Sequence, residues 1–466
     1  MMKMYSLPIG AWARVGVAST LLLAACAPGQ DAPTPNTGVN ASRYVAVGDS
    51  YTAGLSNDGL TRTSQDYSFP NQLAQQFSRA NANATFSQPY LEAGSGSGYL
   101  LLVDLPTTGL PVVRRVAGQA VIRKFANPNA CNGPDTVRLL TRSATASTLP
   151  QNLGVPGLQL TQIETAGLGN AVNATPNGTF NSYFERLLPA ADNRTYLRAV
   201  TDASASATFF TYFMGLDNLL PYVRSGGTCG LSTISSLAPL MNANAKKLLD
   251  ALTAGGRQGM IARLPALTNL PLLRQGQGLL LQRRLQASFG DTARVYYLDN
   301  FGSGQAISES DYVLSTALPR VGVRTPVVVN GTTMMLPYGR DIRNPLSNAD
   351  VLTKNELARA TLVVTNHNTY LEETLAPLYK MPIALDNKRT LDSNAAFPNF
   401  VGESVLVNGV TYSTEPVRGN FFSLDYYSLT PRGNALLANA FILAINSAYR
   451  ANIPAIEVNK LPTLLQ

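Results

Sequence analysis

Histidine and cysteine are scarce in this chain. Its 466 residues include one histidine and three cysteines, and no two cysteines form a Cys-x-x-Cys pair. Protein metal centres are built mainly from clusters of these side chains. The sequence therefore predicts no metal site, and no motif in it indicates a cofactor.

Charged residues are also few, at 14% of the chain, with 36 Lys and Arg against 28 Asp and Glu. The basic residues form no run of the kind that nucleic-acid-binding proteins carry. The glycines within residues 94–98 are not followed by Lys-Ser or Lys-Thr, so we interpret them as a flexible rim and not as a phosphate-binding loop. Nucleic acid is therefore not expected as a partner. The mild positive charge permits loose attraction to an anionic surface such as lipid headgroups.

The N-terminal apolar run, residues 15–25, is shorter than the roughly 20 residues that a membrane-spanning helix needs. Lys3 and Arg14 precede this run and small residues end it, a pattern typical of a secretory signal peptide over residues 1–25. The Leu-Ala-Ala-Cys sequence that ends at Cys26 resembles the lipobox of bacterial lipoproteins. That resemblance implies an acylated Cys26, a membrane anchor through this lipid, and a place in the cell envelope on the periplasmic or cell-surface side.

Three further segments are predicted after the signal peptide. Residues 26–42 are rich in Pro, Thr, Asn and Gly, a composition that stays unfolded and can hold a domain off a membrane. Residues 43–455 are expected to form the folded domain, and residues 456–466 a C-terminal tail. In an oxidising compartment, Cys131 and Cys229 are expected to form a disulfide in preference to a metal site.

Strand-like and helix-like segments alternate along the domain. The sequence predicts strands at 44–48, 208–214, 259–265 and 293–298, and helices at 69–80, 182–200, 242–254, 279–289, 354–379 and from 430 onward. Thr353 and Glu356 form a capping box for the helix at 354–379. This alternation indicates an α/β fold in which a parallel sheet is covered on both faces.

Antiparallel additions to this sheet are predicted at three places. Asn330-Gly331 and Asn408-Gly409 each stand at the centre of a predicted β-hairpin, because type I′ turns need positive φ at two successive residues. Residues 81–150 are expected to form an insertion of strands and loops near the mouth of the site.

The candidate nucleophile follows the first predicted strand. That strand ends in Gly48-Asp49-Ser50, ahead of a helix-like stretch of small residues. Open parallel sheets place their functional groups just beyond the carboxyl ends of the strands, which favours Ser50. Gly-Asp-Ser in this setting resembles the first block of the SGNH (GDSL) ester hydrolase family. Further frames resemble the family in order at residues 152–157, 215–218, 264–271 and 421–433.

The resemblance covers residues 43–455. It implies a three-layer α/β/α, flavodoxin-like SGNH sandwich with a parallel sheet and inserted β-hairpins. It also implies serine ester hydrolysis, with an acyl ester, a lipid or a glycan ester as the ligand. Ser50 would be the nucleophile, Asp425 the carboxylate that orients the base, and Gly157 a donor to the oxyanion.

Two positions depart from the family's pattern. In the late Asp-x-x-His motif, Ser428 stands where the histidine base belongs, and a serine hydroxyl does not accept a proton near neutral pH. In the third block, Asp217 takes the position of the oxyanion-binding asparagine and Asn218 the position after it. An ionised Asp217 cannot donate a hydrogen bond to an oxyanion, whereas a shift of one residue would bring Asn218 into the hole.

Four other side chains near these motifs have structural interpretations. Asp49 is expected to brace its turn, in preference to a role with Asp425 as a glycosidase carboxylate pair. His367 lies on the apolar stripe of the helix at 354–379, where a buried core position is expected and not a replacement base. Tyr426 and Tyr427 replace small residues of the family and would partly fill the pocket.

Two classes of function remain open. One is an active, lipid-anchored esterase or lipase that uses Ser50 with a non-standard base. The other is an impaired or inactive relative that keeps the frame for envelope binding or structure, including a variant that is acylated at Ser50 and never released. Retention of Ser50 and Asp425 favours the first class, while Ser428 and Asp217 favour the second. The sequence assigns neither a substrate nor an oligomeric state.

Overall fold

The computed structural model describes residues 38–106, 110–127, 135–144, 146–175, 179–230, 233–385 and 404–465. These residues belong to one compact unit, which spans Pro35–Gln466. The predicted signal peptide, the lipidation candidate Cys26 and most of the predicted tether lie outside the described residues, so those predictions stay as they are.

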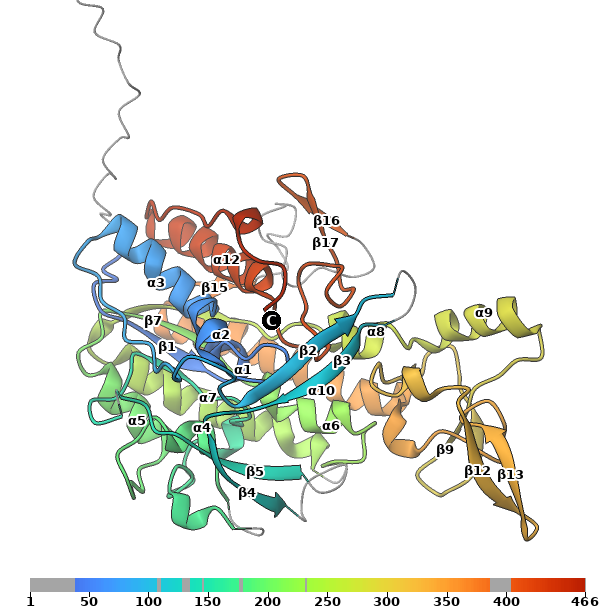
Figure 1. Cartoon of the computed structure of the whole chain (residues 1–466). Helices are drawn as coiled ribbons and strands as arrows, with labels where there is room; N and C mark the ends of the chain where they lie inside the picture. Colours follow the sequence, from blue (N-terminus) through green and yellow to red (C-terminus); the bar gives the residue numbers. More distant parts are fainter. Residues whose placement is uncertain are drawn as a thin grey trace, which may run out of the picture. The chain divides into compact units, whose positions relative to one another are not determined.

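A five-stranded parallel sheet forms the centre of this unit (Figure 1). Its order is β6-β1-β7-β8-β15, formed by β6 (Asn152–Gly154), β1 (Tyr44–Gly48), β7 (Phe209–Phe213), β8 (Gln258–Ala262) and β15 (Ile383–Ala384). β1 pairs with β7 along its whole length, and every residue of both strands is buried. Burial on both faces is typical of parallel sheets. In chain order this is the 2-1-3-4-5 arrangement of flavodoxin-like folds.

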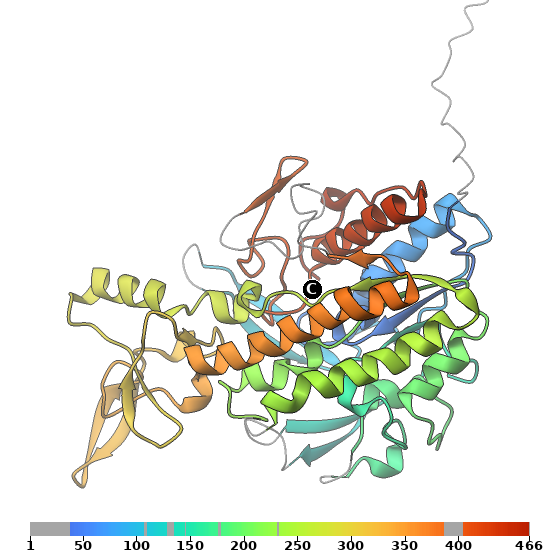
Figure 2. The same cartoon turned by 180° about the vertical axis from the view of Figure 1, so that it is seen from behind.

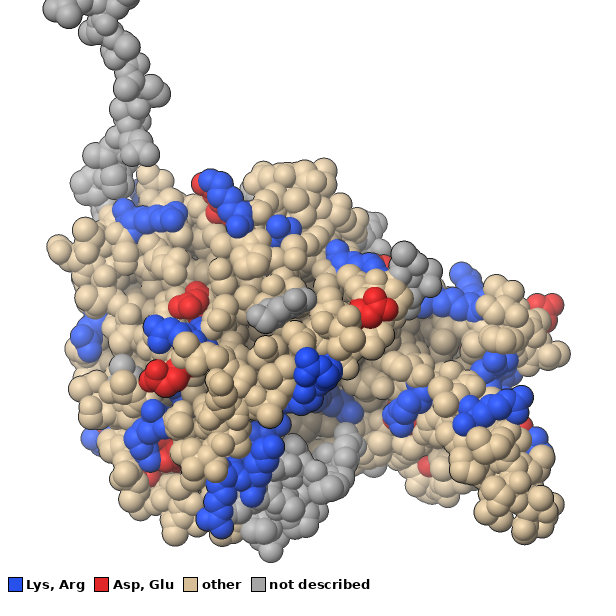
Figure 3. All heavy atoms as spheres, viewed as in Figure 1, with Lys and Arg blue, Asp and Glu red and all other residues tan. Residues whose placement is uncertain are grey.

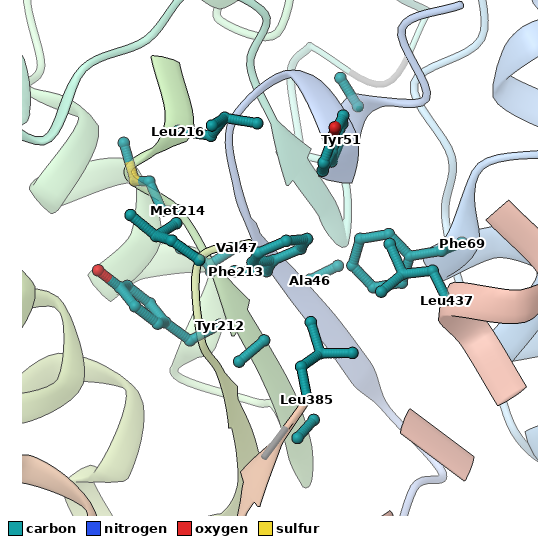
Figure 4. Packing of buried hydrophobic residues seen from close by; sticks show 14 of the residues in the cluster. Ala46, Val47, Tyr51, Phe69, Tyr212, Phe213, Met214, Leu216, Leu385 and Leu437 are labelled. Carbon is teal, nitrogen blue, oxygen red and sulfur yellow. The ribbon is translucent and has the colours of Figure 1, made fainter. Parts of the chain in front are cut away.

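Helices cover both faces of the sheet (Figures 1 and 2). One layer consists of α3 (Phe69–Ala80) and α12 (Pro431–Tyr449), and the other of α5 (Tyr196–Ser204), α7 (Leu237–Thr253) and α10 (Lys354–Tyr370). Phe213 of β7 contacts Phe69 and Phe441 of the first layer. Its neighbour Tyr212 points to the opposite face, as strand alternation requires (Figure 4). The predicted α/β class with a parallel sheet is confirmed.

Shorter helices connect these elements. They are α1 (Ser50–Ala53), α2 (Arg62–Asp66), α4 (Ser182–Glu185), α6 (Leu220–Arg224), α8 (Pro271–Arg274), α9 (Gly278–Phe289) and α11 (Ala376–Tyr379). The π-helical segment η9 (Leu371–Leu375) makes α10 and α11 continuous, and the 3₁₀ turn η3 (Leu216–Asn218) follows β7.

Small antiparallel pairs lie outside the parallel sheet. They are β2 (Gly98–Asp104) with β3 (Val112–Ala117), β4 (Val121–Asn127) with β5 (Asp135–Leu140), β9 (Tyr296–Leu298) with β10 (Gly304–Ala306), β11 (Tyr312–Val313) with β14 (Val351–Leu352), β12 (Arg324–Val329) with β13 (Thr332–Pro337), and β16 (Val405–Val407) with β17 (Val410–Tyr412). Both Asn-Gly hairpins and strands within residues 81–150 were predicted, whereas the pair within residues 296–306 and the pair of residues 312–313 with 351–352 were not. Both Asn-Gly turns have positive φ at the two central residues, which confirms the hairpin signal. The capping box at the start of α10 is also present.

Two predicted elements differ from the structure. The helix expected at 182–200 is interrupted between α4 and α5, where Pro189 lacks the N–H that a continuous helix needs. The strand expected at 293–298 is limited to β9, which pairs with β10 and lies outside the parallel sheet. The short strand β15 takes the fifth place instead, beside β8.

Packing continues into the segments predicted as tether and tail. Val39 and Ala41, before β1, are buried in the main core. Near the other end of the chain, Val458 is also part of this core, and Asn57 Nδ2 donates to the Leu465 carbonyl oxygen (2.9 Å). A second, smaller core lies within residues 281–351 and includes Leu281, which belongs to α9.

Candidate functional site

Ser50 stands at the carboxyl end of the central strand β1. It is the first residue of α1, and its side chain is buried, with the residue 3% exposed. The last residue of the strand is Gly48, and any larger residue would clash there, because a Cβ would lie 2.0 Å from Thr52 Oγ1 and 2.1 Å from the Phe213 carbonyl oxygen. The tight strand-to-helix turn therefore requires glycine, and it directs Ser50 toward the neighbouring strand ends.

Gly157 comes to the same place from β6, the neighbour of β1. The Val155 N–H donates to the Gly48 carbonyl oxygen (3.1 Å), which holds the turn after β6 against the end of β1. Gly157 has φ +74°, a conformation that favours glycine. Its N–H points to Ser50 Oγ (3.4 Å), and the residue is exposed, with Asn181 Nδ2 as the nearest neighbour of a Cβ at this position (4.0 Å). The structure thus brings the predicted nucleophile and the predicted oxyanion donor together.

Asp217 occupies the point where these donors converge. One oxygen, Oδ2, accepts hydrogen bonds from Ser50 Oγ (2.6 Å), the Ser50 N–H (3.1 Å) and the Gly157 N–H (2.8 Å). Asp217 belongs to η3 at the end of β7 and is 4% exposed. Two backbone N–H groups aimed at one oxygen form the arrangement that stabilises an oxyanion during acyl transfer. Here a carboxylate of the same chain already fills it.

Asn218 does not reach this point. Its Oδ1 accepts the Leu160 N–H (2.8 Å), and its buried Nδ2 has no hydrogen-bond partner within the described residues. Asp217 and Asn218, both in η3, therefore face different neighbours: Asp217 faces Ser50, and Asn218 faces the segment after Gly157.

Asp49 braces the turn that carries Asp217. Its Oδ2 accepts the N–H groups of Gly215 (2.9 Å) and Asp217 (3.3 Å), so it links the end of β1 to the end of β7. Burial and the charge of Asp217 raise the pKa of the Asp49 carboxyl well above its ordinary value. Burial also raises the pKa of Asp217, although hydrogen bonds from Ser50 and Gly157 counteract this. Two adjacent buried carboxylates thus disfavour simultaneous ionisation.

The late motif forms a separate buried turn around Asp425. Asp425 Oδ1 accepts the Ser428 N–H (2.8 Å), the Tyr427 N–H (3.1 Å) and Ser423 Oγ (3.1 Å). Its Oδ2 accepts the Asp58 N–H (2.6 Å) and the hydroxyl of Ser428. Ser428 is fully buried, and its Oγ also bonds with Ser423 Oγ (2.7 Å). Both groups that would form the dyad are committed to holding this turn.

Short contacts join the late turn to the segment that follows Ser50. Tyr51 donates its hydroxyl to the Tyr427 carbonyl oxygen (2.6 Å), and Ser56 Oγ donates to the Leu429 carbonyl oxygen (2.9 Å). Within the described residues, no hydrogen bond runs from Ser50 to Asp425 or to Ser428. The two halves of the candidate site are neighbours without forming one hydrogen-bonded relay.

Tyr426 and Tyr427 are buried aromatic residues of the late turn. Their expected role in partly filling the pocket stays a prediction. The Arg224 guanidinium lies over the Tyr427 ring, 5.2 Å from its centroid, and the Tyr427 hydroxyl is 3.4 Å from Asp58 Oδ1. Tyr51 packs against Phe213 on the core side (Figure 4).

His367 is a core residue of α10. Its Nδ1 is hydrogen-bonded to Asn242 Oδ1 of α7 (2.8 Å), and its Nε2 has no partner within the described residues. Burial lowers the pKa of the imidazole to about 4. A neutral imidazole held between two helices, with no described contact to Ser50, matches the structural interpretation.

Several contributors to the site were absent from the sequence prediction. Asp58 and Ser423 hold Asp425, Tyr51 ties the two halves together, and Arg224 covers Tyr427. Ser423 lies two residues before Asp425 and Tyr51 directly follows Ser50, so proximity to the motifs was the available signal. Asp58 and Arg224 carry no such signal.

Cys229 is disulfide-bonded. Cys131 lies outside the described residues, so its pairing with Cys229 stays a prediction. Among the described residues, no cluster of three or more His, Cys, Asp or Glu side chains could bind a metal ion. The same residues include no helix that is long and apolar enough to cross a membrane.

No family model, curated protein or solved structure matches this chain, so no family is identified. The structure itself establishes an α/β fold with a five-stranded parallel sheet.

Proposed function

We propose that this chain is a lipid-anchored SGNH-type protein that does not hydrolyse esters at an appreciable rate. Three features support the SGNH frame: the strand order, the position of Ser50 after the central strand, and the approach of Gly157 from the adjacent strand end. In flavodoxin-like sheets this edge is where ligands bind. Two residues of the motifs that suggested the family, Ser50 and Gly157, therefore lie together at the edge of the sheet where such a site is expected.

The position of Asp217 Oδ2 carries the proposal. Ester hydrolysis by serine develops negative charge on the carbonyl oxygen, which must be met by hydrogen-bond donors. The N–H groups of Ser50 and Gly157 are instead satisfied by the Asp217 carboxylate. A substrate carbonyl would have to displace this carboxylate, and an ionised Asp217 beside it would repel the oxyanion.

The base required for the reaction is also missing. A serine nucleophile needs a group that takes its proton and later returns it to the leaving alcohol. Ser428 stands at the base position, is fully buried, and is held by Asp425 and Ser423. Loss of a triad member typically lowers kcat by about 10⁴ to 10⁶-fold.

The same frame suits an envelope role without turnover. We assign the protein to the cell envelope through lipid on Cys26, with binding of an acyl ester, a lipid or a glycan as the retained property. The exposed face of Gly157 is the open side of the site, because the other residues around Asp217 are buried.

A second candidate function rests on one contact. Ser50 Oγ donates to Asp217 Oδ2 at 2.6 Å, and burial raises the pKa of Asp217, a combination that suits a general base. In this alternative Asp217 activates Ser50, and the protein is an active esterase. The alternative requires Oδ2 to leave the N–H groups of Ser50 and Gly157 so that these can bind the oxyanion.

Hydrolysis of p-nitrophenyl acetate and butyrate tests the proposal. The buried core begins at Val39 and ends at Val458, so a chain that starts at residue 27 retains all of it. The unchanged protein and Ser50→Ala are expected to show equal rates, at the level of the uncatalysed reaction. Hydrolysis that depends on Ser50 would overturn the proposal.

Asp217→Asn separates the two candidate functions. If Asp217 only fills the oxyanion site, the amide variant has an unchanged or higher rate; if Asp217 is the base, the variant loses all activity that depends on Ser50. Ser428→His tests the missing base directly, and a thermal melt must accompany it because Ser428 is fully buried. A folded Ser428→His variant that gains hydrolysis would support the interpretation that the missing base silences the site.

A further inference from the structure

Exposed apolar side chains are concentrated in one peripheral part of the molecule. Eight of the seventeen large apolar side chains that are exposed among the described residues lie between residues 278 and 350. This segment is a small fraction of the chain, so the concentration is not the scatter expected of an ordinary surface. Figure 1 places this segment, with β12 and β13 at its outer end, apart from the parallel sheet.

The β12–β13 hairpin presents an apolar face without a partner in the described chain. Pro326 stands opposite Met335 and Val328 opposite Thr333, which puts these four side chains on one face of the ribbon. Val328 is 69% exposed and Met335 is 53% exposed. On the other face Leu336 is buried, so the two faces of the hairpin differ.

Charge is absent from the hairpin and present at its base. Residues 325–337 include no charged side chain. Five arginines of this part of the chain form no ion pair with a carboxylate within the described residues: Arg283, Arg284, Arg294, Arg324 and Arg340. Arg324 is the first residue of β12, and the Arg340 guanidinium lies 3.6 Å from the centroid of the Phe289 ring. Figure 3 shows Lys and Arg side chains near the base and none at the outer end.

An uncharged apolar tip bordered by arginines is complementary to an anionic lipid surface. Apolar side chains partition into the boundary between headgroups and acyl chains, and arginines bind the phosphates above it while their stems stay in apolar contact. We propose that the β12–β13 hairpin docks onto anionic phospholipid, with Val328 and Met335 entering the interface and the arginines at its base contacting headgroup phosphates. This site is independent of Ser50 and goes beyond the proposed function of that region.

Vesicle binding by the chain that starts at residue 27 tests the proposal, because this chain has no acyl group at Cys26. The probes are vesicles of phosphatidylcholine alone and of an equal mixture of phosphatidylcholine and phosphatidylglycerol, measured by co-sedimentation. Binding is expected only to the anionic vesicles and is expected to weaken at high salt. The double variant Val328→Asp with Met335→Asp is expected to bind at least ~10-fold more weakly, because both apolar contacts are replaced by charges of the same sign as the lipid.

The other Asn-Gly hairpin supplies a matched control. Leu406 of β16 is 63% exposed, and Leu406→Asp introduces one negative charge, as each single change of the double variant does, at a similar apolar position. This variant is expected to bind like the unchanged protein. Equal weakening by both changes, no binding by the unchanged protein, or a concentration-dependent dimer that the double variant abolishes would overturn the proposal. The dimer result would assign the face to a second copy of the chain.

Discussion

Asp217 and Asp425 are both buried carboxylates beside the ends of the parallel sheet, but their surroundings differ. Asp425 shares five donors between its two oxygens, and those donors come from its own turn and from Asp58. Asp217 takes three donors on a single oxygen and lies against a second buried carboxylate, Asp49. Asp425 therefore stabilises a turn, whereas Asp217 fills a site that could bind another anion.

The motif around Asp425 and the motif around Ser50 therefore have different structural roles in this chain. Asp425 holds a buried turn of which Ser428 is a member. The N–H groups of Ser50 and Gly157 converge on one point, and the Asp217 carboxylate of the same chain occupies it. Four substitutions test this contrast.

Asp425→Ala is expected to have the largest effect. The change removes the acceptor of the N–H groups of Asp58, Tyr427 and Ser428, and it leaves the hydroxyls of Ser423 and Ser428 only each other as a partner in the turn. We expect the free energy of unfolding at neutral pH to fall by about 4 kcal/mol, measured by urea denaturation. A loss below about 1 kcal/mol would mean that the turn does not depend on this carboxylate.

Ser428→Ala removes one member of the same turn. Its hydroxyl bonds with Asp425 and with Ser423, and both partners stay buried. We expect a loss of about 2 kcal/mol by the same measurement. An equally stable variant would show that Ser428 contributes nothing to the turn.

Asp217→Asn is expected to act in the opposite direction. Burial raises the folded-state pKa of Asp217 above 3.8, so between that value and the folded-state pKa the folded chain binds more protons than the unfolded chain. The free energy of unfolding of the unchanged protein therefore falls as pH rises through this window, with Asp49 contributing in the same sense. Asparagine does not titrate, so the variant lacks the contribution of Asp217 to this fall with pH. We therefore expect its free energy of unfolding to be about 1–2 kcal/mol higher at neutral pH than that of the unchanged protein.

Denaturation series of both proteins across pH check this prediction. Parallel stability curves for the unchanged protein and Asp217→Asn would contradict it. A variant that is less stable at neutral pH would show that the hydrogen bonds to the Asp217 carboxylate stabilise the fold by more than the burial of its charge destabilises it.

Gly157→Ala is expected to have the smallest effect. The nearest atom to a Cβ at this position is Asn181 Nδ2 at 4.0 Å, so the cost is limited to the positive φ, about 1 kcal/mol. Gly48→Ala is the control, because its Cβ would overlap the Phe213 carbonyl oxygen and should cost considerably more. Equal losses for the two variants in thermal melts would contradict this description of the two turns.

Local sequence was sufficient for elements whose signals are short-range. The helix predicted at 69–80 coincides with α3, and the capping box of Thr353 and Glu356 forms as expected. The Asn-Gly turns fix two hairpins because only residues that tolerate positive φ fit there. The apolar run before Gly215 identified the buried strand β7.

Tertiary structure decided what short-range signals leave open. Residues 296–298 have the same strand character as a sheet member, but they pair with β10, and the two-residue strand β15 takes the edge of the sheet. At the site, the resemblance implied that Ser50 and Gly157 lie near Asp217 or Asn218, without deciding which of these two side chains of η3 faces Ser50. Asp49 Oδ2 accepts the N–H groups of Gly215 and Asp217 in the turn after β7 and so orients Asp217, and these contacts join residues far apart in the chain. Residue identity thus determined the available donors and acceptors, while strand packing determined which of them meet.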